Sequence, residues 1–91
     1  MTKSVFTDEY EQFRNLLVEA RKSCSITQAE LAARLGKPQS FVSKYERGER
    51  RLDLIEFIAI AHALGLNAGK FVDQIEHWIR KRSHARPVHR L

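Results

Sequence analysis

The sequence predicts an all-α protein, a compact bundle of five helices. A chain of 91 residues is long enough for one domain with a small core. Apolar residues recur at three- and four-residue steps along five segments, and no alternating strand pattern competes with them. Residues that start or stop helices separate the segments: Thr27, Asp53 and Asn67 as N-caps, and Gly36 and Gly65 as stops.

The first expected helix carries an apolar stripe of four residues: Tyr10, Phe13, Leu17 and Ala20. We expect it to begin at Thr7, because Asp8 and Glu9 then fall in the first turn, where negative charge suits the positive helix end. Cys24 follows near its end. As the only cysteine of the chain, it excludes an intrachain disulfide and is expected to act as a small apolar group.

Residues 28–47 predict two short helices joined by a tight turn. Thr27 and Glu30 form a capping box at the start, and Gly36 suits the C-terminal cap, which requires a positive φ. Pro38 then starts the second helix, 38–46, where its missing N–H costs nothing. The positions expected in the crevice between the two helices are small or apolar: Leu31, Ala32, Leu35, Val42 and Tyr45.

The outer face of the helix 38–46 contains no acid. Amide and hydroxyl groups on this face donate and accept hydrogen bonds, as base edges in a major groove require. We therefore expect four residues to read DNA bases: Gln39, Ser40, Ser43 and Lys44. Gln39 is the first candidate because its amide matches N6 and N7 of adenine, whereas Lys44 suits either guanine or a phosphate.

The positive charge of the chain is concentrated around this segment. Lysines and arginines outnumber acids 16 to 11, a net charge of +5 that suits a polyanionic partner. Gln28 begins a helix whose N-terminal amides favour an anion, so we expect it to contact a phosphate. Arg47, Arg50 and Arg51 follow the reading helix and are interpreted either as phosphate contacts or as plain surface charge.

The motif residues of this region read Thr27-Gln28-x-Glu30-Leu31-Ala32, Gly36, Gln39, Val42-Ser43 and Glu46-x-Gly48. Together they resemble the helix-turn-helix repressors of the phage Cro and lambda repressor type, the XRE-like regulators. The likeness covers residues 13–72. It implies a lambda-repressor-like fold and a transcriptional regulator, a repressor in this interpretation, that binds double-stranded DNA at a pseudo-palindromic operator as a homodimer.

The resemblance also implies roles for individual residues. In that family the glutamine equivalent to Gln28 contacts a phosphate, and an ion pair between Arg21 and Glu46 ties the first helix to the end of the reading helix. Two positions depart from the family pattern. Lys37 stands where an apolar residue is usual, so we expect it to reach a phosphate, and Pro38 stands where a Ser or Thr cap is common.

Two more helices and a tail complete the prediction. The fourth helix has Asp53 and Glu56 as its cap pair and a stripe of Leu54, Phe57, Ile58, Ala61 and Leu64. The fifth has the stripe Phe71, Val72, Ile75, Trp78 and Ile79. Trp78 and Ile79, in the segment 73–82, fit either a dimer contact or packing within the chain.

The two ends of the chain are expected to differ. Residues 83–91 are expected to form a flexible basic tail that is either solvated or touches DNA nonspecifically. Residues 1–12 are expected to form an N-terminal segment that enters the first helix.

Other classes of function find little support. The chain shows no paired carboxylates, nucleophile–base pair or phosphate loop, so we expect neither an enzyme nor a cofactor. The spacing of His62, His77, His84 and His89 does not suit zinc. No signal or membrane segment is apparent, which predicts a cytoplasmic protein of a bacterium or phage. An antitoxin or protein-binding adaptor on the same scaffold, with a toxin as partner, stays the alternative.

Overall fold

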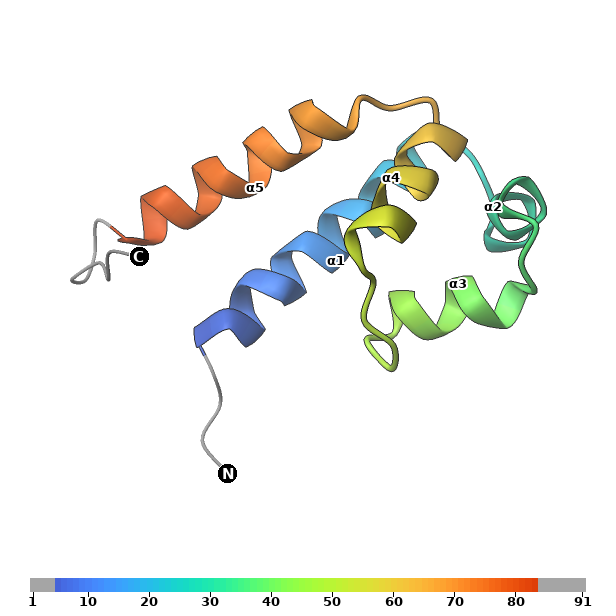
Figure 1. Ribbon diagram of the computed structural model, residues 1–91, viewed down its shortest axis with the longest axis horizontal. Coiled ribbons are helices and arrows are strands. Elements are labelled where there is room, and N and C mark those ends of the chain that lie inside the picture. The colour runs from blue at the N-terminus through green and yellow to red at the C-terminus, as the bar shows by residue number, and fades with distance from the viewer. Residues whose placement is uncertain (1–4, 84–91) are drawn as a thin grey trace.

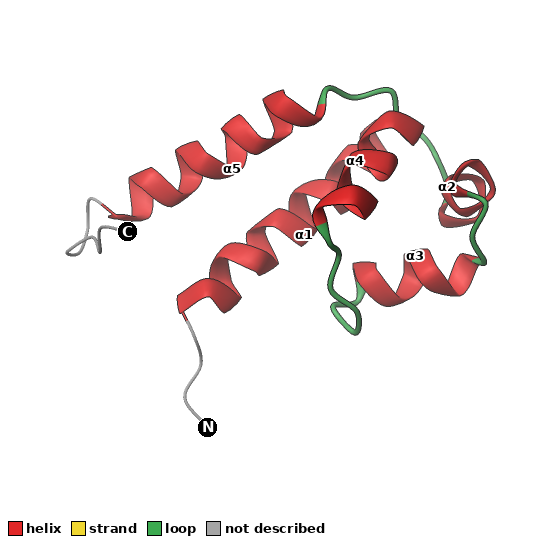
Figure 2. Cartoon of the chain, in the orientation of Figure 1, coloured by secondary structure: helices red, strands yellow, loops and turns green. Residues whose placement is uncertain are grey.

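Five helices and no strand make up the part of the chain that the structure describes. The computed structural model describes the backbone of residues 5–83 and the side chains of residues 8–82. The helices are α1 (Val5–Ser23), α2 (Gln28–Leu35), α3 (Gln39–Glu46), α4 (Leu54–Ala63) and α5 (Ala68–Ser83) (Figure 2). The predicted all-α class and five-helix architecture are confirmed.

Local cap signals set most helix ends. At α2, Glu30 donates its backbone N–H to the Thr27 hydroxyl at 3.0 Å, and Thr27 donates its own N–H to the Glu30 carboxylate at 2.9 Å. Gly36 ends this helix in the left-handed conformation, with φ of 68°. Asp53 and Glu56 form the second capping box, at the start of α4. These predicted caps are confirmed.

Two predicted helix starts are wrong by one or two residues. Helix α1 begins at Val5, so Thr7 lies inside its first turn and is not its N-cap. Helix α3 begins at Gln39, and Pro38 precedes it in an extended conformation with ψ of 154°. The Pro38 carbonyl accepts the N–H of Phe41 at 3.0 Å. Pro38 is therefore the N-cap, a position at which its missing N–H also costs nothing.

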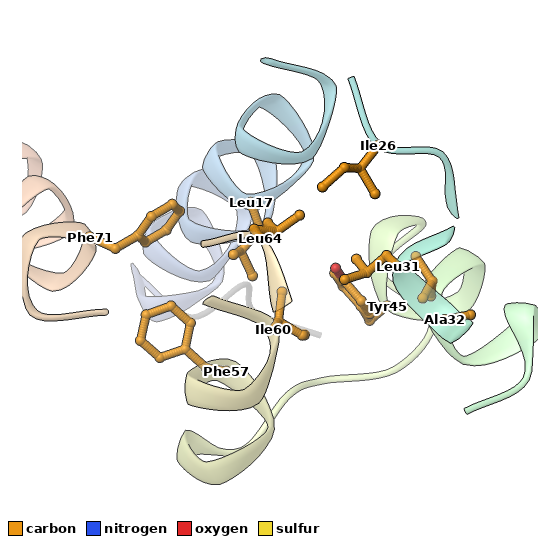
Figure 3. Packing of buried hydrophobic residues seen from close by; sticks show 10 residues of the cluster. Leu17, Ile26, Leu31, Ala32, Tyr45, Phe57, Ile60, Leu64 and Phe71 are labelled. Atoms are coloured by element: carbon orange, nitrogen blue, oxygen red, sulfur yellow. The ribbon is translucent and has the colours of Figure 1, made fainter. Parts of the chain in front are cut away.

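The core gathers side chains from all five helices (Figure 3). Leu17, Leu31, Val42, Tyr45 and Ile60 are completely buried. Helix α2 packs against α3 and α4, while α1 packs against α3 and α5. The remaining buried apolar side chains are Ile26, Ala32, Phe57, Ala61, Leu64 and Phe71.

Two residues expected in the core are exposed. Leu54 is 64% exposed because it is the first residue of α4 and lies at the edge of the bundle. Val72 is 48% exposed. Phe71 and Ile75, four residues apart, face the bundle, and Val72 is turned about 100° away from Phe71 on the helix.

Helices α2 and α3 lie at one end of the molecule, and the C-terminal end of α5 lies at the other (Figure 1). This arrangement leaves the outer side of α3 uncovered along one edge. Within the described residues, no single helix is long and apolar enough to cross a bilayer. Helices α4 and α5 reach the length and composition of a membrane span only when they are taken together, and the break between them is bent by 118°. Both of them contribute buried side chains to the core.

Candidate nucleic-acid interface

The two faces of α3 have opposite environments. Val42 and Tyr45 are fully buried on the inner side. On the outer side Gln39, Ser40 and Lys44 are exposed, and the first turn of the helix carries no acid. The helix is thus anchored by one face and presents amide, hydroxyl and ammonium groups on the other.

Ser43 is the one predicted reading residue that is half-buried. Its hydroxyl donates to the Ser40 carbonyl of the same helix at 3.3 Å. This bond uses the hydroxyl hydrogen, so Ser43 offers its oxygen as an acceptor to an incoming donor such as the exocyclic amine of adenine or cytosine.

Glu46, the last residue of α3, is the centre of a buried ionic network. Arg21 of α1 donates from Nε and Nη2 to the two carboxylate oxygens of Glu46, at 2.7 and 3.0 Å. Both residues are less than one-tenth exposed. The hydrogen bond from Arg21 to Glu46 raises the pKa of Arg21 above its ordinary value, so the guanidinium stays charged at any physiological pH. The structure therefore brings together the two residues expected to pair.

The same network includes Gln28, for which a phosphate contact is expected. Gln28 Nε2 donates to Glu46 Oε1 at 2.9 Å, and the side chain is half-buried. One hydrogen of the amide is engaged in this way and the second is left for another acceptor. The start of α2 is thereby joined to the end of α3 through side chains.

Arg14 of α1 completes the anchoring of α3. Its Nη1 donates to the backbone carbonyl of Glu46 at 2.6 Å, at the negative end of the helix. Gly48 follows with φ of +80°, and a Cβ placed on it would lie 3.3 Å from Arg14 Nε. A close approach and a positive φ both call for glycine at this turn.

The cations expected at phosphates differ in their surroundings. Arg47 pairs with Glu49, with both side chains more than half exposed. Arg51 stacks on the ring of Tyr10, with its Cζ 4.0 Å from the ring centroid. Lys37 is exposed in the turn before α3. All three lie at the surface near α3.

Among these cations, Arg50 makes the largest set of contacts with its neighbours. It donates to both carboxylate oxygens of Glu56, at 2.9 and 2.6 Å, and to the Arg51 carbonyl at 2.9 Å. Its Cζ lies 4.8 Å from the ring centroid of Phe41 on α3. Hydrogen bonds from Arg50 and from the Asp53 backbone lower the pKa of Glu56 to about 2.

Sequence reasoning did not find the roles of Arg14, Phe41 and Glu56. Arg14 stands seven residues before Arg21, a spacing that places both on one face of α1 and could have indicated a second anchor. Phe41 is apolar and does not lie on the polar outer face of α3, and Glu56 was expected only as part of a cap. Their contact with Arg50 crosses a loop, where helical spacing has no predictive value.

Trp78 and Ile79 are half-buried on α5. Arg82 of the same helix covers the Trp78 ring, with its Cζ 4.9 Å from the centroid. Ser83, expected to begin the basic tail, is instead the last residue of α5. The rest of the expected tail, 84–91, with His84 and His89, lies outside the described residues. Within residues 8–82, no three His, Cys, Asp or Glu side chains come together as metal ligands would.

A different surface exposes large apolar side chains: Leu54, Ile55 and Val72. We call these three residues the α4–α5 patch. Two of its residues, Leu54 and Val72, line a groove of about 210 Å³ together with Phe13, Leu52, Phe57 and Phe71, and Ile55 is the next residue of α4 after Leu54.

Comparisons with known proteins agree with this geometry. The family model described as Helix-turn-helix matches residues 17–71. Among solved structures, an XRE-family like protein from Pseudomonas syringae pv. tomato is 46% identical, with a TM-score of 0.80, over 81% of this chain and 90% of that one. The restriction-modification controller protein C.AhdI from Aeromonas hydrophila is 29% identical, with a TM-score of 0.63, over 71% of this chain and 97% of that one. No curated protein matches the chain.

Proposed function

The chain belongs to the XRE-like helix-turn-helix family of DNA-binding transcriptional regulators, and we propose that it is a repressor that reads an operator through the major groove with α3. The observation that carries this proposal is the contrast between the two faces of α3. One face is sealed by Val42 and Tyr45, and the other is exposed, polar and free of acids along Gln39–Lys44. We propose that the protein, of bacterial or phage origin, acts in the bacterial cytoplasm and is associated with the nucleoid when bound to DNA.

The proposed contacts fall into two groups. Base edges are read by exposed or half-exposed residues of α3: Gln39, Ser40, Ser43 and Lys44. Phosphates on either side of the groove are held by residues that flank α3: Gln28, Lys37, Arg47, Arg50 and Arg51. Backbone contacts of this kind orient the protein on the duplex, and base contacts give it sequence preference.

We further propose that the protein binds its operator as a homodimer joined through the α4–α5 patch. The patch begins directly after the loop that carries Arg47, Arg50 and Arg51, so an interface there lies next to the proposed DNA-facing surface. Trp78 and Ile79 are the second proposed contact. We favour the patch because Leu54 and Ile55 are more than three-fifths exposed, whereas Arg82 already covers Trp78.

The α4–α5 patch also suits the alternative function, an antitoxin or adaptor that holds another protein. Both functions use an exposed apolar surface, but only the repressor requires salt-dependent binding to duplex DNA. An antitoxin that also binds DNA would show both properties, and addition of its toxin would then change the stoichiometry of the protein–DNA complex.

Selection of bound oligonucleotides from a random duplex pool tests the proposed function. The expected result is a pseudo-palindrome with half-sites about 10 bp apart, centre to centre. On the selected duplex, Gln39→Ala should cost about 1 to 3 kcal/mol and relax preference at one base position, whereas Lys37→Ala should weaken all sequences alike. A pool that stays random, with no salt-dependent binding, would reject the repressor.

A further inference from the structure

Arg50 differs from its neighbouring arginines in how completely its guanidinium is held. The edge formed by Nη1 and Nη2 faces the Glu56 carboxylate, and Nη1 also donates to the Arg51 carbonyl. One flat side of the group lies near the Phe41 ring. Three groups of different chemistry therefore fix one side chain that is still 42% exposed. A simple surface ion pair needs only the first of them.

The fixed guanidinium has one edge left over. Among the described residues, Nε and the second hydrogen of Nη2 have no hydrogen-bond partner. These two N–H groups lie side by side on the planar group, in the fork geometry that matches two oxygens of a phosphate. The Glu56 side chain is only 20% exposed, half the exposure of Arg50. The guanidinium thus lies on the solvent side of the carboxylate and shields it from an approaching anion.

We infer that Glu56 and Phe41 are positioning residues that hold Arg50 as a preformed two-donor fork for a DNA phosphate. The inference rests on the proposed function and deepens it by assigning residues that touch no DNA themselves. Phe41 belongs to the reading helix, so the ring links the position of the fork to that of the base-reading residues on α3. A side chain already ordered in the free protein loses less conformational entropy when the phosphate binds.

If Glu56 has this positioning role, removing its charge should change DNA affinity in the direction opposite to that expected from simple electrostatics. An acid near DNA repels phosphates, so removing its charge should strengthen binding. If Glu56 positions Arg50, removing that charge should weaken binding instead. Glu56→Gln is a suitable variant because glutamine also serves in a capping box, so its side-chain oxygen can still accept the Asp53 N–H that starts α4.

The test measures Kd by fluorescence anisotropy for wild type, Glu56→Gln, Arg50→Lys and the double variant over a range of salt concentrations. The probe is a labelled mixed-sequence duplex about three helical turns long, and thermal unfolding first establishes that each variant is folded. Glu56→Gln should weaken binding about three- to tenfold and reduce the salt slope by about one. Arg50→Lys keeps the charge but loses the fork, and in that background Glu56→Gln should cause no further weakening.

Glu49→Gln is the matched control. Glu49 also pairs with an arginine, Arg47, but the two side chains are equally exposed and the carboxylate is not shielded. This variant should bind as well as wild type or better. If Glu56→Gln also binds as well or better, or weakens binding equally in the Arg50→Lys background, the positioning role is rejected while the proposed function stands. If wild type shows no salt-dependent binding, both are rejected.

Discussion

Arg14 of α1 donates a hydrogen bond of 2.6 Å to the backbone carbonyl of Glu46, the last residue of α3. A cation at this place satisfies a carbonyl left free by the helix and stabilises the negative end of its dipole. The C-terminal end of α3 is therefore stabilised by a side chain from another helix. We expect Arg14→Met to lower the free energy of unfolding by about 1 to 2 kcal/mol, measured by urea denaturation. Lys22→Met, on an exposed position of the same helix, should change it by less than about 0.5 kcal/mol.

Removal of the Glu46 carboxylate should be more costly. Glu46→Ala leaves Arg21 buried without its counter-ion, which typically costs about 3 to 5 kcal/mol of unfolding free energy. We expect Glu46→Ala to lower the free energy of unfolding without changing which bases the protein prefers. The double variant Arg21→Met/Glu46→Leu should recover part of the loss, because it removes both charges together. A Glu46→Ala protein as stable as wild type would contradict a stabilising role for the pair.

Tyr45 and Tyr10 provide a matched pair of hydroxyl deletions. The Tyr45 side chain is fully buried (Figure 3). Its hydroxyl has no hydrogen-bond partner among the described residues. The Tyr10 hydroxyl accepts the N–H of Leu52 at 3.0 Å. Tyr45→Phe should leave the unfolding free energy unchanged or raise it by about 1 kcal/mol, whereas Tyr10→Phe should lower it by about 1 kcal/mol. The reverse order in urea denaturation would show that the Tyr45 hydroxyl is bonded to water.

The low pKa of Glu56 predicts a dependence of stability on acid. Arg50 and the Asp53 backbone lower this pKa from 4.5 to about 2 in the folded protein. The folded state therefore binds the proton less readily than the unfolded state. The contribution is complete above about pH 5 and is lost as pH falls from 4.5 to 2. The difference in unfolding free energy between wild type and Glu56→Gln should shrink over that window, and a constant difference would contradict the assignment.

The proposed dimer predicts a difference between two surfaces. Ile55→Glu puts a charge into the α4–α5 patch on a side chain that is 72% exposed, so the monomer fold should tolerate it. We expect this variant to sediment as a monomer and to bind the selected palindrome more weakly, since one half-site must then be bound alone. Trp78→Ala should stay dimeric. The opposite pattern would move the interface to Trp78 and Ile79, and a monomeric wild type would remove the dimer from the proposal.

The parts of the fold that depend on neighbouring residues could be predicted from the sequence. The Thr27–Glu30 and Asp53–Glu56 capping boxes act over three residues, and their residue types determine the hydrogen bonds. The left-handed turn at Gly36 is also a local property. These signals placed α2 and α4 correctly. The start of α1 at Val5 was not predicted, because Thr7 with Asp8 and Glu9 offers a start signal two residues later and helix ends are weakly determined by sequence.

The parts that depend on packing could not be predicted. Leu54 and Val72 have the right spacing for a core stripe, yet both are exposed, because periodicity cannot show where the bundle ends. Periodicity did predict the exposed face of α3, by contrast, because Val42 and Tyr45 mark the buried side of that helix. The pairing of Arg50 with Glu56 and Phe41 needed coordinates, because the irregular segment between α3 and α4 decides where Arg50 lies.

The hydrogen bond between Gln28 and Glu46 fixes the distance between the start of α2 and the end of α3. One end of this link lies where a backbone phosphate is proposed to bind, and the other lies at the end of the helix proposed to enter the groove. Neither side chain moves without disturbing a buried network of charges. We expect this link to fix the distance between the proposed phosphate contact and the proposed groove contact, so that a duplex whose backbone and groove floor are spaced differently from B-form DNA would satisfy one contact and not the other.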